Sequence, residues 1–161
     1  MILRADPKTF FVFDLDDTIY YELDFLSSAF RRIAKFIEPE QNSELYNEMM
    51  EVYFSGDNTF FFLTQKYPEK NLSIADLLEL YRNHYPDINL RTGVSEFLEK
   101  IRKRGAYTGI ITNGRSVTQR NKLKALKVDN LFDEIIISEE IGSLRHFIAI
   151  FAAKYASLFA V

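Results

Sequence analysis

Hydrophobic positions change their spacing along the chain, and these changes predict how the chain is organised. Near the start, residues 10–13 form a run of four apolar residues, Phe-Phe-Val-Phe, which ends in a group of acidic residues. Such a run suits a strand that is buried on both faces of a parallel sheet. Strands that alternate with helices are predicted again from residue 90 onwards. This alternation favours an α/β fold with a parallel, doubly wound sheet.

Residues 20–88 lie between these two regions and show helical spacing. Leu26 and Phe30 begin a series of apolar residues at helical intervals, and Pro39 stops the series. The apolar stretch 60–63 is interpreted as helical, with a strand as the alternative. Because an ordinary connection between a strand and a helix is only a few residues long, we expect a separate, mainly helical subdomain here.

The second half of the chain contains two further predicted strands, residues 107–112 (YTGIIT) and 134–138 (EIIIS). The helix predicted between them carries several basic side chains. We interpret these as a solvated face, with Arg115 close enough to the site to be an exception. The basic residues of this helix are Arg115, Arg120, Lys122, Lys124 and Lys127.

Composition narrows the class of protein. The chain has 161 residues, of which 47% are hydrophobic, so we expect a globular domain rather than disorder. The net charge of -3 and the pI of about 5.5 provide no electrostatic footprint for nucleic acid. The absence of cysteine excludes disulfides and thiolate metal sites. With no visible signal peptide and no apolar stretch of spanning length, we expect a cytoplasmic protein without a membrane partner.

Three carboxylates, Asp14, Asp16 and Asp17, follow the first predicted strand and precede Thr18. Ligands bind at this end of the strands in open parallel sheets. Alternation along an extended chain points Asp14 and Asp16 the same way. Two carboxylates in one crevice make a hard oxygen site for Mg²⁺, or a pair that divides the roles of nucleophile and acid/base. The alternative is an acidic turn favoured by the capping preferences of Asp and Thr, and Asp17 itself is interpreted as a turn or capping residue.

The string DLDDT resembles the first motif of the haloacid dehalogenase-like (HAD) hydrolases, D-x-D-x-T after a hydrophobic strand. The resemblance implies that Asp14 is the nucleophile that attacks a phosphoryl group, that Asp16 is the general acid/base, and that both bind Mg²⁺. It also implies a Rossmann-like core made of residues 1–19 and 89–161. A helical cap at residues 20–88 would then cover the site and select the substrate. The alternative is an elaborated crossover without a gating role.

Two further stretches resemble motifs of the same family. Thr112 ends the second predicted strand, and Asn113 and Gly114 follow it. There, a hydroxyl and two backbone amides near a helix start would clamp a phosphate. Asn-Gly is also simply a good turn. The stretch LFDEIIISEEIG is similar to the family pattern Ser-Glu-Glu-x-Gly, which a lysine follows three residues later. The residue at that position is Arg145, which the resemblance implies neutralises the phosphate, although a guanidinium is not interchangeable with an ammonium.

The end of the chain departs from the family pattern. The acidic fourth motif, which would complete the Mg²⁺ site, is absent, and residues 147–161 are strongly apolar. This tail is expected to be a helix packed on the sheet or, at SLFAV, a fourth strand. A truncated or frame-altered family member is a further alternative. We therefore expect a C-terminally incomplete core with weak Mg²⁺ affinity and little activity, whose open sheet edge pairs with the tail or leads to self-association.

The combined pattern predicts a Mg²⁺-dependent phosphatase that hydrolyses a small phosphorylated metabolite through an aspartyl-phosphate intermediate. The substrate is expected to be a sugar phosphate or a nucleoside monophosphate. The presence of Asp16 argues against dehalogenase chemistry, because family members that cleave halides lack this acid. The alternative function is that of a catalytically silent or truncated family member that binds phosphate or acts as an interaction protein.

Overall fold

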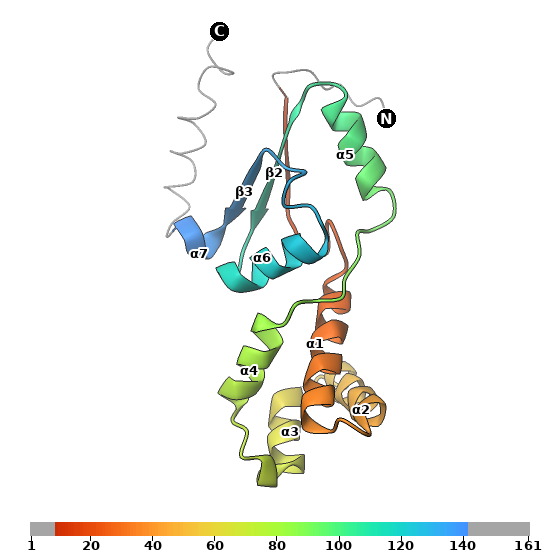
Figure 1. Cartoon of the computed structure of the whole chain (residues 1–161), viewed down its shortest axis with the longest axis vertical. Coiled ribbons are helices and arrows are strands. Elements are labelled where there is room, and N and C mark those ends of the chain that lie inside the picture. Colours follow the sequence, from red (N-terminus) through yellow and green to blue (C-terminus); the bar gives the residue numbers. More distant parts are fainter. Residues whose placement is uncertain (1–8, 142–161) are drawn as a thin grey trace. The chain divides into compact units, whose positions relative to one another are not determined.

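The structure is a computed structural model that describes residues 9–141 (Figure 1). Its sheet has three parallel strands in the order β1-β2-β3. These strands are β1 (Phe10–Phe13), β2 (Tyr107–Thr112) and β3 (Glu134–Ile137). A parallel sheet among helices confirms the α/β fold class predicted from the alternation of strands and helices.

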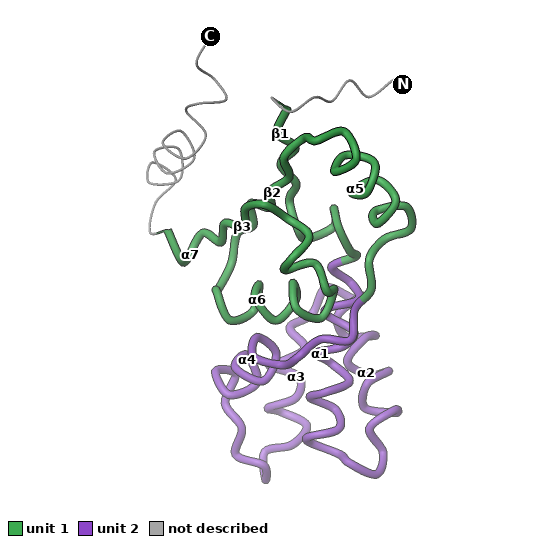
Figure 2. Tube along the Cα trace, turned by 45° about the horizontal axis from the view of Figure 1, so that its top comes forward, with its two compact units in different colours: residues 1–21, 89–161 green, residues 22–88 purple. Residues whose placement is uncertain are grey.

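The chain divides into two compact units, residues 1–21 with 89–161 (unit 1) and residues 22–88 (unit 2), which are coloured separately in Figure 2. Besides the sheet, unit 1 contains three described helices. They are α5 (Val94–Arg102), which precedes β2, α6 (Ser116–Ala125), which connects β2 to β3, and α7 (Ser138–Ile141), which follows β3.

The core of unit 1 lies between its sheet and its helices. Phe13 of β1 meets Phe97 of α5 edge to face, with ring centroids 6.1 Å apart. Val12, in contrast, is 47% exposed, so the predicted burial of this strand on both faces is wrong at that position. An apolar run predicts a strand, but coverage of each face depends on what packs there. The fully buried side chains of this core include Ile101, Ile110, Leu123 and Ile137.

The close approach of β1 and β2 depends on a glycine. Gly109 is paired in register with Val12 on one side and with Glu134 on the other. A Cβ atom at position 109 would lie 2.9 Å from ring carbon Cε1 of Phe10 and 3.3 Å from the carbonyl oxygen of Glu134. The ring of Phe10 also stacks on Tyr107, with centroids 6.1 Å apart. The absence of a side chain at Gly109 therefore makes room for the Phe10 ring over β2.

Arg91 joins the two segments of unit 1 that border residues 22–88. Its backbone N–H donates to the carbonyl of Ile19 at 2.9 Å, and its guanidinium donates to the carbonyl of Asp17. The same guanidinium lies 4.5 Å from the ring centroid of Tyr21. The segment that follows β1 and the segment that leads to α5 are therefore held side by side.

Unit 2 is helical throughout. The apolar spacing that begins at Leu26 continues to Ile37, where the first helix ends two residues before Pro39. Residues 60–63 lie inside a helix, so the alternative of a strand there is excluded. The elements of unit 2 are α1 (Glu22–Ile37), α2 (Asn42–Phe54), α3 (Thr59–Lys66), the 3-10 turn η1 (Pro68–Lys70) and α4 (Ile74–Asn83).

The core of unit 2 forms because each helix contributes one apolar stripe. Ser73 caps α4 by accepting a hydrogen bond from the backbone N–H of Asp76, whose carboxylate accepts one from the backbone N–H of Ser73 in return. No helix in the described part of the chain is long and apolar enough to cross a membrane. The buried core residues are Leu26, Phe30, Ile33, Ala34, Ile37, Leu45, Met49, Leu63 and Leu77.

Candidate functional site

The first predicted site residue, Asp14, directly follows β1 and is exposed. Its Oδ1 atom accepts a hydrogen bond from the backbone N–H of Leu15 at 2.8 Å. The fully buried Leu15 side chain anchors the turn that follows, which closes through a hydrogen bond of 3.0 Å from the N–H of Ile19 to the carbonyl of Leu15. Asp17 lies in this turn with a φ of 52°, a conformation that aspartate tolerates better than most residues. The turn presents the Asp14 carboxylate to solvent at the C-terminal end of β1.

Asp16 has different surroundings. Its Oδ1 atom accepts hydrogen bonds from Lys122 Nζ at 2.7 Å and from the hydroxyl of Tyr20, and its Oδ2 atom accepts one from Gln119 Nε2 at 2.9 Å. Burial alone would raise the pKa of Asp16, but the charge of Lys122 and the hydrogen bonds from these three side chains outweigh it, so the pKa lies below its usual value. Two carboxylates only two residues apart therefore differ in exposure and in partners, which is the condition for giving them different chemical roles.

The second predicted motif lies at the C-terminal end of β2. Thr112 is the last residue of β2 and is buried, and its hydroxyl oxygen accepts a hydrogen bond from Gln119 Nε2. Asn113 and Gly114 form an exposed turn between β2 and α6. Ser138, which follows β3, donates to Asn113 Oδ1 at 2.6 Å and accepts from the backbone N–H of Gly114 at 3.0 Å. The ends of β2 and β3 are thereby joined beside this turn.

Gln119 connects the two motifs. Its Nε2 atom contacts both Asp16 and Thr112. Its side chain also packs against the turn, because a Cβ atom at Gly114 would lie 3.2 Å from its Cγ and Cδ atoms. Gly114 has a φ of 147°, so glycine is favoured there for its backbone conformation as well. One buried amide therefore joins the turn after β1 to the turn after β2.

The acidic residues that follow β3 contact the start of α6. Glu139 accepts a hydrogen bond from the backbone N–H of Ser116 at 2.7 Å, where a carboxylate suits the positive end of the helix dipole. Glu140 pairs with Arg120, with a closest N–O distance of 2.6 Å. The hydrogen bond from Arg120 lowers the pKa of Glu140. These two glutamates therefore help to attach α7 to α6.

The predicted solvated face of α6 is wrong at Lys122. Lys122 is 5% exposed and Gln119 is 2% exposed. The sequence does carry a signal for this, because Gln119, Lys122 and the buried Leu126 recur at intervals of three and four residues. Lys124, by contrast, is exposed. The many basic residues of this helix led to the prediction of a solvated face, although Lys122 lies on the buried face.

The two arginines predicted near the site differ in whether the structure describes them. Arg115 is exposed and lies directly before α6. Arg145, the residue expected to neutralise the phosphate, lies outside the described residues, as does the apolar tail. Their roles stay predictions.

The possible metal donors at the C-terminal end of β1 are oxygen atoms. Within residues 9–141 no three histidine, cysteine or acidic side chains gather into a group that could hold a metal ion. The exposed Asp14 carboxylate and the nearby backbone carbonyl of Asp16 are nevertheless hard oxygen donors. Mg²⁺ in phosphoryl-transfer sites binds through one or two carboxylates, phosphate oxygens and water. The donor set therefore fits Mg²⁺ in company with a phosphorylated ligand.

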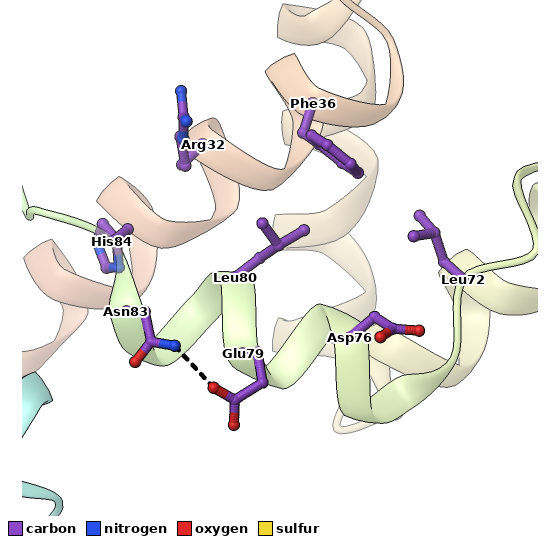
Figure 3. A pocket seen from close by; sticks show the side chains of 8 residues that line it. All are labelled: Arg32, Phe36, Leu72, Asp76, Glu79, Leu80, Asn83 and His84. Atoms are coloured by element: carbon purple, nitrogen blue, oxygen red, sulfur yellow. Dashed lines mark hydrogen bonds between the residues drawn. The ribbon is translucent and has the colours of Figure 1, made fainter.

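Each unit also contains a concavity. In unit 1 a cavity of about 340 Å³ is lined mainly by apolar groups, with Ile19 and Phe97 among them. In unit 2 a groove of about 490 Å³ lies between α1 and α4 (Figure 3). Figure 3 shows Arg32 and Phe36 on one side of it and Glu79 on the other, where Glu79 accepts a hydrogen bond of 2.7 Å from Asn83. Neither concavity includes Asp14, Asp16 or the turn after β2.

Comparison with known proteins identifies the class of this chain. Residues 11–146 match the family model for haloacid dehalogenase-like hydrolases. Since this match covers most of the chain, the chain belongs to the haloacid dehalogenase-like hydrolase family. The resemblance inferred from the DLDDT motif is confirmed.

Two curated relatives share one name. The glyceraldehyde 3-phosphate phosphatase of Methanopyrus kandleri is 31% identical over 144 residues, which cover 81% of this chain and 62% of that protein. The glyceraldehyde 3-phosphate phosphatase of Methanothermobacter thermautotrophicus is 29% identical over 151 residues, which cover 86% of this chain and 66% of that protein. The chain thus spans less than two thirds of the length of either relative.

Solved structures support the fold. A HAD-superfamily hydrolase from Geobacter sulfurreducens superposes with a TM-score of 0.58 at 15% identity and covers 94% of this chain and 74% of that one. A HAD hydrolase from Bacillus subtilis, solved with bound magnesium, superposes with a TM-score of 0.57 at 17% identity and covers 93% of this chain and 73% of that one. At these identities the similarity concerns the fold, and it supports the Rossmann-like character of the core.

Proposed function

We propose that this chain acts as a Mg²⁺-dependent phosphatase that hydrolyses a small sugar phosphate, with glyceraldehyde 3-phosphate as the first candidate. The observation that carries the proposal is the contrast between Asp14 and Asp16. One carboxylate is exposed at the end of β1, and the other is held by three side chains beside the turn after β2. The names of the relatives favour a sugar phosphate over a nucleoside monophosphate.

In the proposed first step, a carboxylate oxygen of Asp14 attacks the phosphorus atom. The bond between phosphorus and the sugar oxygen breaks, and that oxygen takes a proton from the carboxyl group of Asp16. The products are the free sugar, an aspartyl phosphate on Asp14 and the Asp16 carboxylate. The charge of Lys122 and the hydrogen bonds to Asp16 hold its pKa low, so a proton must be supplied when substrate binds. The negative charge of the phosphate acts in that direction, because a nearby anion raises the pKa of a carboxyl group.

In the second step, the Asp16 carboxylate takes a proton from a water molecule whose oxygen attacks the phosphorus. The bond between phosphorus and Asp14 breaks, which restores the Asp14 carboxylate and releases inorganic phosphate. This step uses Asp16 in its ionised form, which the low pKa of Asp16 favours. The proton that Asp16 gains here is available for the next substrate.

The phosphate is proposed to bind at the turn after β2, through the Thr112 hydroxyl and the Asn113 and Gly114 amides. Oriented backbone amides at the start of a helix favour an anion. Asp14 and the carbonyl of Asp16 would hold Mg²⁺, which offsets the repulsion between an anionic nucleophile and an anionic substrate. Unit 2 is proposed to serve as the cap that selects the substrate, and Arg145 to add positive charge at the phosphate.

The test is release of inorganic phosphate from glyceraldehyde 3-phosphate, with Mg²⁺ and with a chelator. Asp14→Asn should abolish turnover, because an amide cannot form the aspartyl phosphate. Asp17→Asn is the matched control, since asparagine also tolerates the left-handed conformation at position 17, and it should retain turnover. Equal activity with and without Mg²⁺, or full activity of Asp14→Asn, would refute the proposal. Phosphate binding without any turnover would support the silent phosphate-binding protein instead.

A further inference from the structure

The buried face of α6 carries two polar side chains where a helix packed on a sheet normally carries apolar ones. Gln119 and Lys122 lie three residues apart on this face, and both are almost completely buried. An ammonium group is costly to remove from water unless an anion compensates it. Their presence at these positions therefore requires an explanation beyond packing.

Both side chains bind the same carboxylate from the same helix. Lys122 contacts Oδ1 of Asp16 at 2.7 Å, and Gln119 contacts Oδ2 at 2.9 Å. Tyr20, which is fully buried, donates its hydroxyl to Oδ1, and its ring centroid lies 5.8 Å from Lys122 Nζ. A carboxylate held through both oxygens has little freedom to rotate, and charge-assisted hydrogen bonds of this kind are the strong ones.

Gln119 adds a second constraint. The same amide nitrogen contacts the Thr112 hydroxyl, and the Gln119 side chain fills the space beside Gly114. The position of the Asp16 carboxylate is thereby fixed relative to the turn after β2. That turn is where the phosphate is proposed to bind.

We propose that Gln119 and Lys122 are positioning residues, which hold the Asp16 carboxyl group at a set place relative to the phosphate-binding turn. Lys122 fixes its orientation through Oδ1, and Gln119 fixes its distance from Thr112 and Gly114. The inference rests on the proposed phosphatase function, because it assigns these two residues to the proton-transfer step. Both residues act through the Asp16 carboxyl group, and neither is proposed to contact the substrate.

Loss of a merely structural ion pair would slow the reaction of all substrates alike. Loss of positioning would instead slow most the substrate that needs the proton of Asp16, and this contrast provides the test. An alkyl phosphate such as glyceraldehyde 3-phosphate releases a strongly basic oxygen that needs the proton of Asp16. An aryl phosphate such as 4-nitrophenyl phosphate releases a stabilised phenolate that needs it far less. Loss of positioning should therefore slow the alkyl phosphate much more than the aryl phosphate.

The experiment compares Lys122→Met and Gln119→Leu with the wild type on both substrates. Lys124→Met is the matched control, because Lys124 is an exposed lysine on the same helix. We expect kcat/KM for glyceraldehyde 3-phosphate to fall about 10²-fold, the effect of misplacing a reacting group by roughly 1 Å. The fall for 4-nitrophenyl phosphate should be smaller by about tenfold or more. Gln119→Leu keeps the ion pair of Lys122 with Asp16, so it offers a folded variant if Lys122→Met is unstable.

A second comparison uses Asp16→Asn as the background. If Lys122 acts through Asp16, adding Lys122→Met to Asp16→Asn should cause no further loss of activity. Equal losses on both substrates, or a further loss of full size in the Asp16→Asn background, would overturn the inference. Absence of turnover in the wild type would instead refute the proposed phosphatase. Because the inference assigns Gln119 and Lys122 to the proton-transfer step of that reaction, it would fall together with the phosphatase.

Discussion

The hydroxyl of Tyr20 offers a direct test of the network around Asp16. Tyr20→Phe removes one oxygen atom from a fully buried side chain and leaves the ring in place. Asp16 keeps its contacts with Lys122 and Gln119 but loses one of two hydrogen bonds to Oδ1. The substitution therefore removes the hydrogen bond from Tyr20 to an ionised group.

The size of the effect follows from the exposure of Asp16. A hydrogen bond to a charged group contributes about 1.5–3 kcal/mol to stability. The Asp16 side chain is 24% exposed, so water can replace part of the lost interaction. We therefore expect Tyr20→Phe to lower the free energy of unfolding of unit 1 by about 1.5 kcal/mol at neutral pH, the lower end of that range.

The pH dependence should follow the titration of Asp16. Its folded-state pKa is held below the usual value. The contribution of ionised Asp16 to the free energy of unfolding is therefore fully present above the unfolded-state pKa of about 3.9 and is lost as the pH falls through the folded-state pKa. Tyr20→Phe raises the folded-state pKa toward its usual value. The stability difference between wild type and variant should therefore be constant above about pH 5 and shrink as the pH falls below about 4.

The assay is equilibrium urea unfolding followed by circular dichroism at several pH values. Tyr85→Phe is the matched control, because Tyr85 is 66% exposed, and it should change neither the midpoint nor its pH dependence. A Tyr20→Phe variant as stable as the wild type at neutral pH, or a difference that does not change with acidification, would contradict the reasoning. Either result would mean that the Tyr20 hydroxyl does not interact with an ionised Asp16 in solution.

Two further substitutions test the packing of each unit. Gly109→Ala should destabilise unit 1 by about 1 kcal/mol in urea unfolding, because the added Cβ meets the Phe10 ring at 2.9 Å. Combining it with Phe10→Leu should remove most of this loss, and a loss that persists would point to the Glu134 carbonyl instead. Met49→Ala should destabilise unit 2 by about 2–5 kcal/mol, since Met49 is fully buried. If unit 2 unfolds in urea as a separate transition, Met49→Ala should lower the midpoint of that transition and leave the midpoint of unit 1 unchanged.

Local patterns were sufficient for much of the fold. The strand predicted at residues 107–112 has the same bounds as β2, and the helix expected before Pro39 ends at Ile37. These predictions succeed because apolar periodicity and proline act over a few residues. The exposure of Val12 was not predictable in the same way. It depends on which elements cover each face of the sheet, and a run of apolar residues does not contain that information.

The candidate site shows a similar division. Asp14 and Thr112 could be placed because Asp14 directly follows one predicted strand, Thr112 ends another, and parallel strands end at one edge of the sheet. The pairing of Asp16 with Gln119 and Lys122 joins residues more than a hundred positions apart. No local pattern specifies such a contact, and a lysine in a basic helix is more often solvated. Only the spacing of Lys122 relative to Leu126 hinted that it faces inward.

The contacts of Arg91 with Ile19, Asp17 and Tyr21 have a consequence for how this chain tolerates change. Because these contacts hold the two borders of residues 22–88 together within unit 1, we expect the pairing of β1 with β2 to depend only weakly on the length of what lies between them. The entropic cost of holding the two ends of an insert together grows only with the logarithm of the insert's length. We therefore expect the register of the parallel strands to be kept when residues 22–88 are exchanged or resized through evolution or by domain grafting.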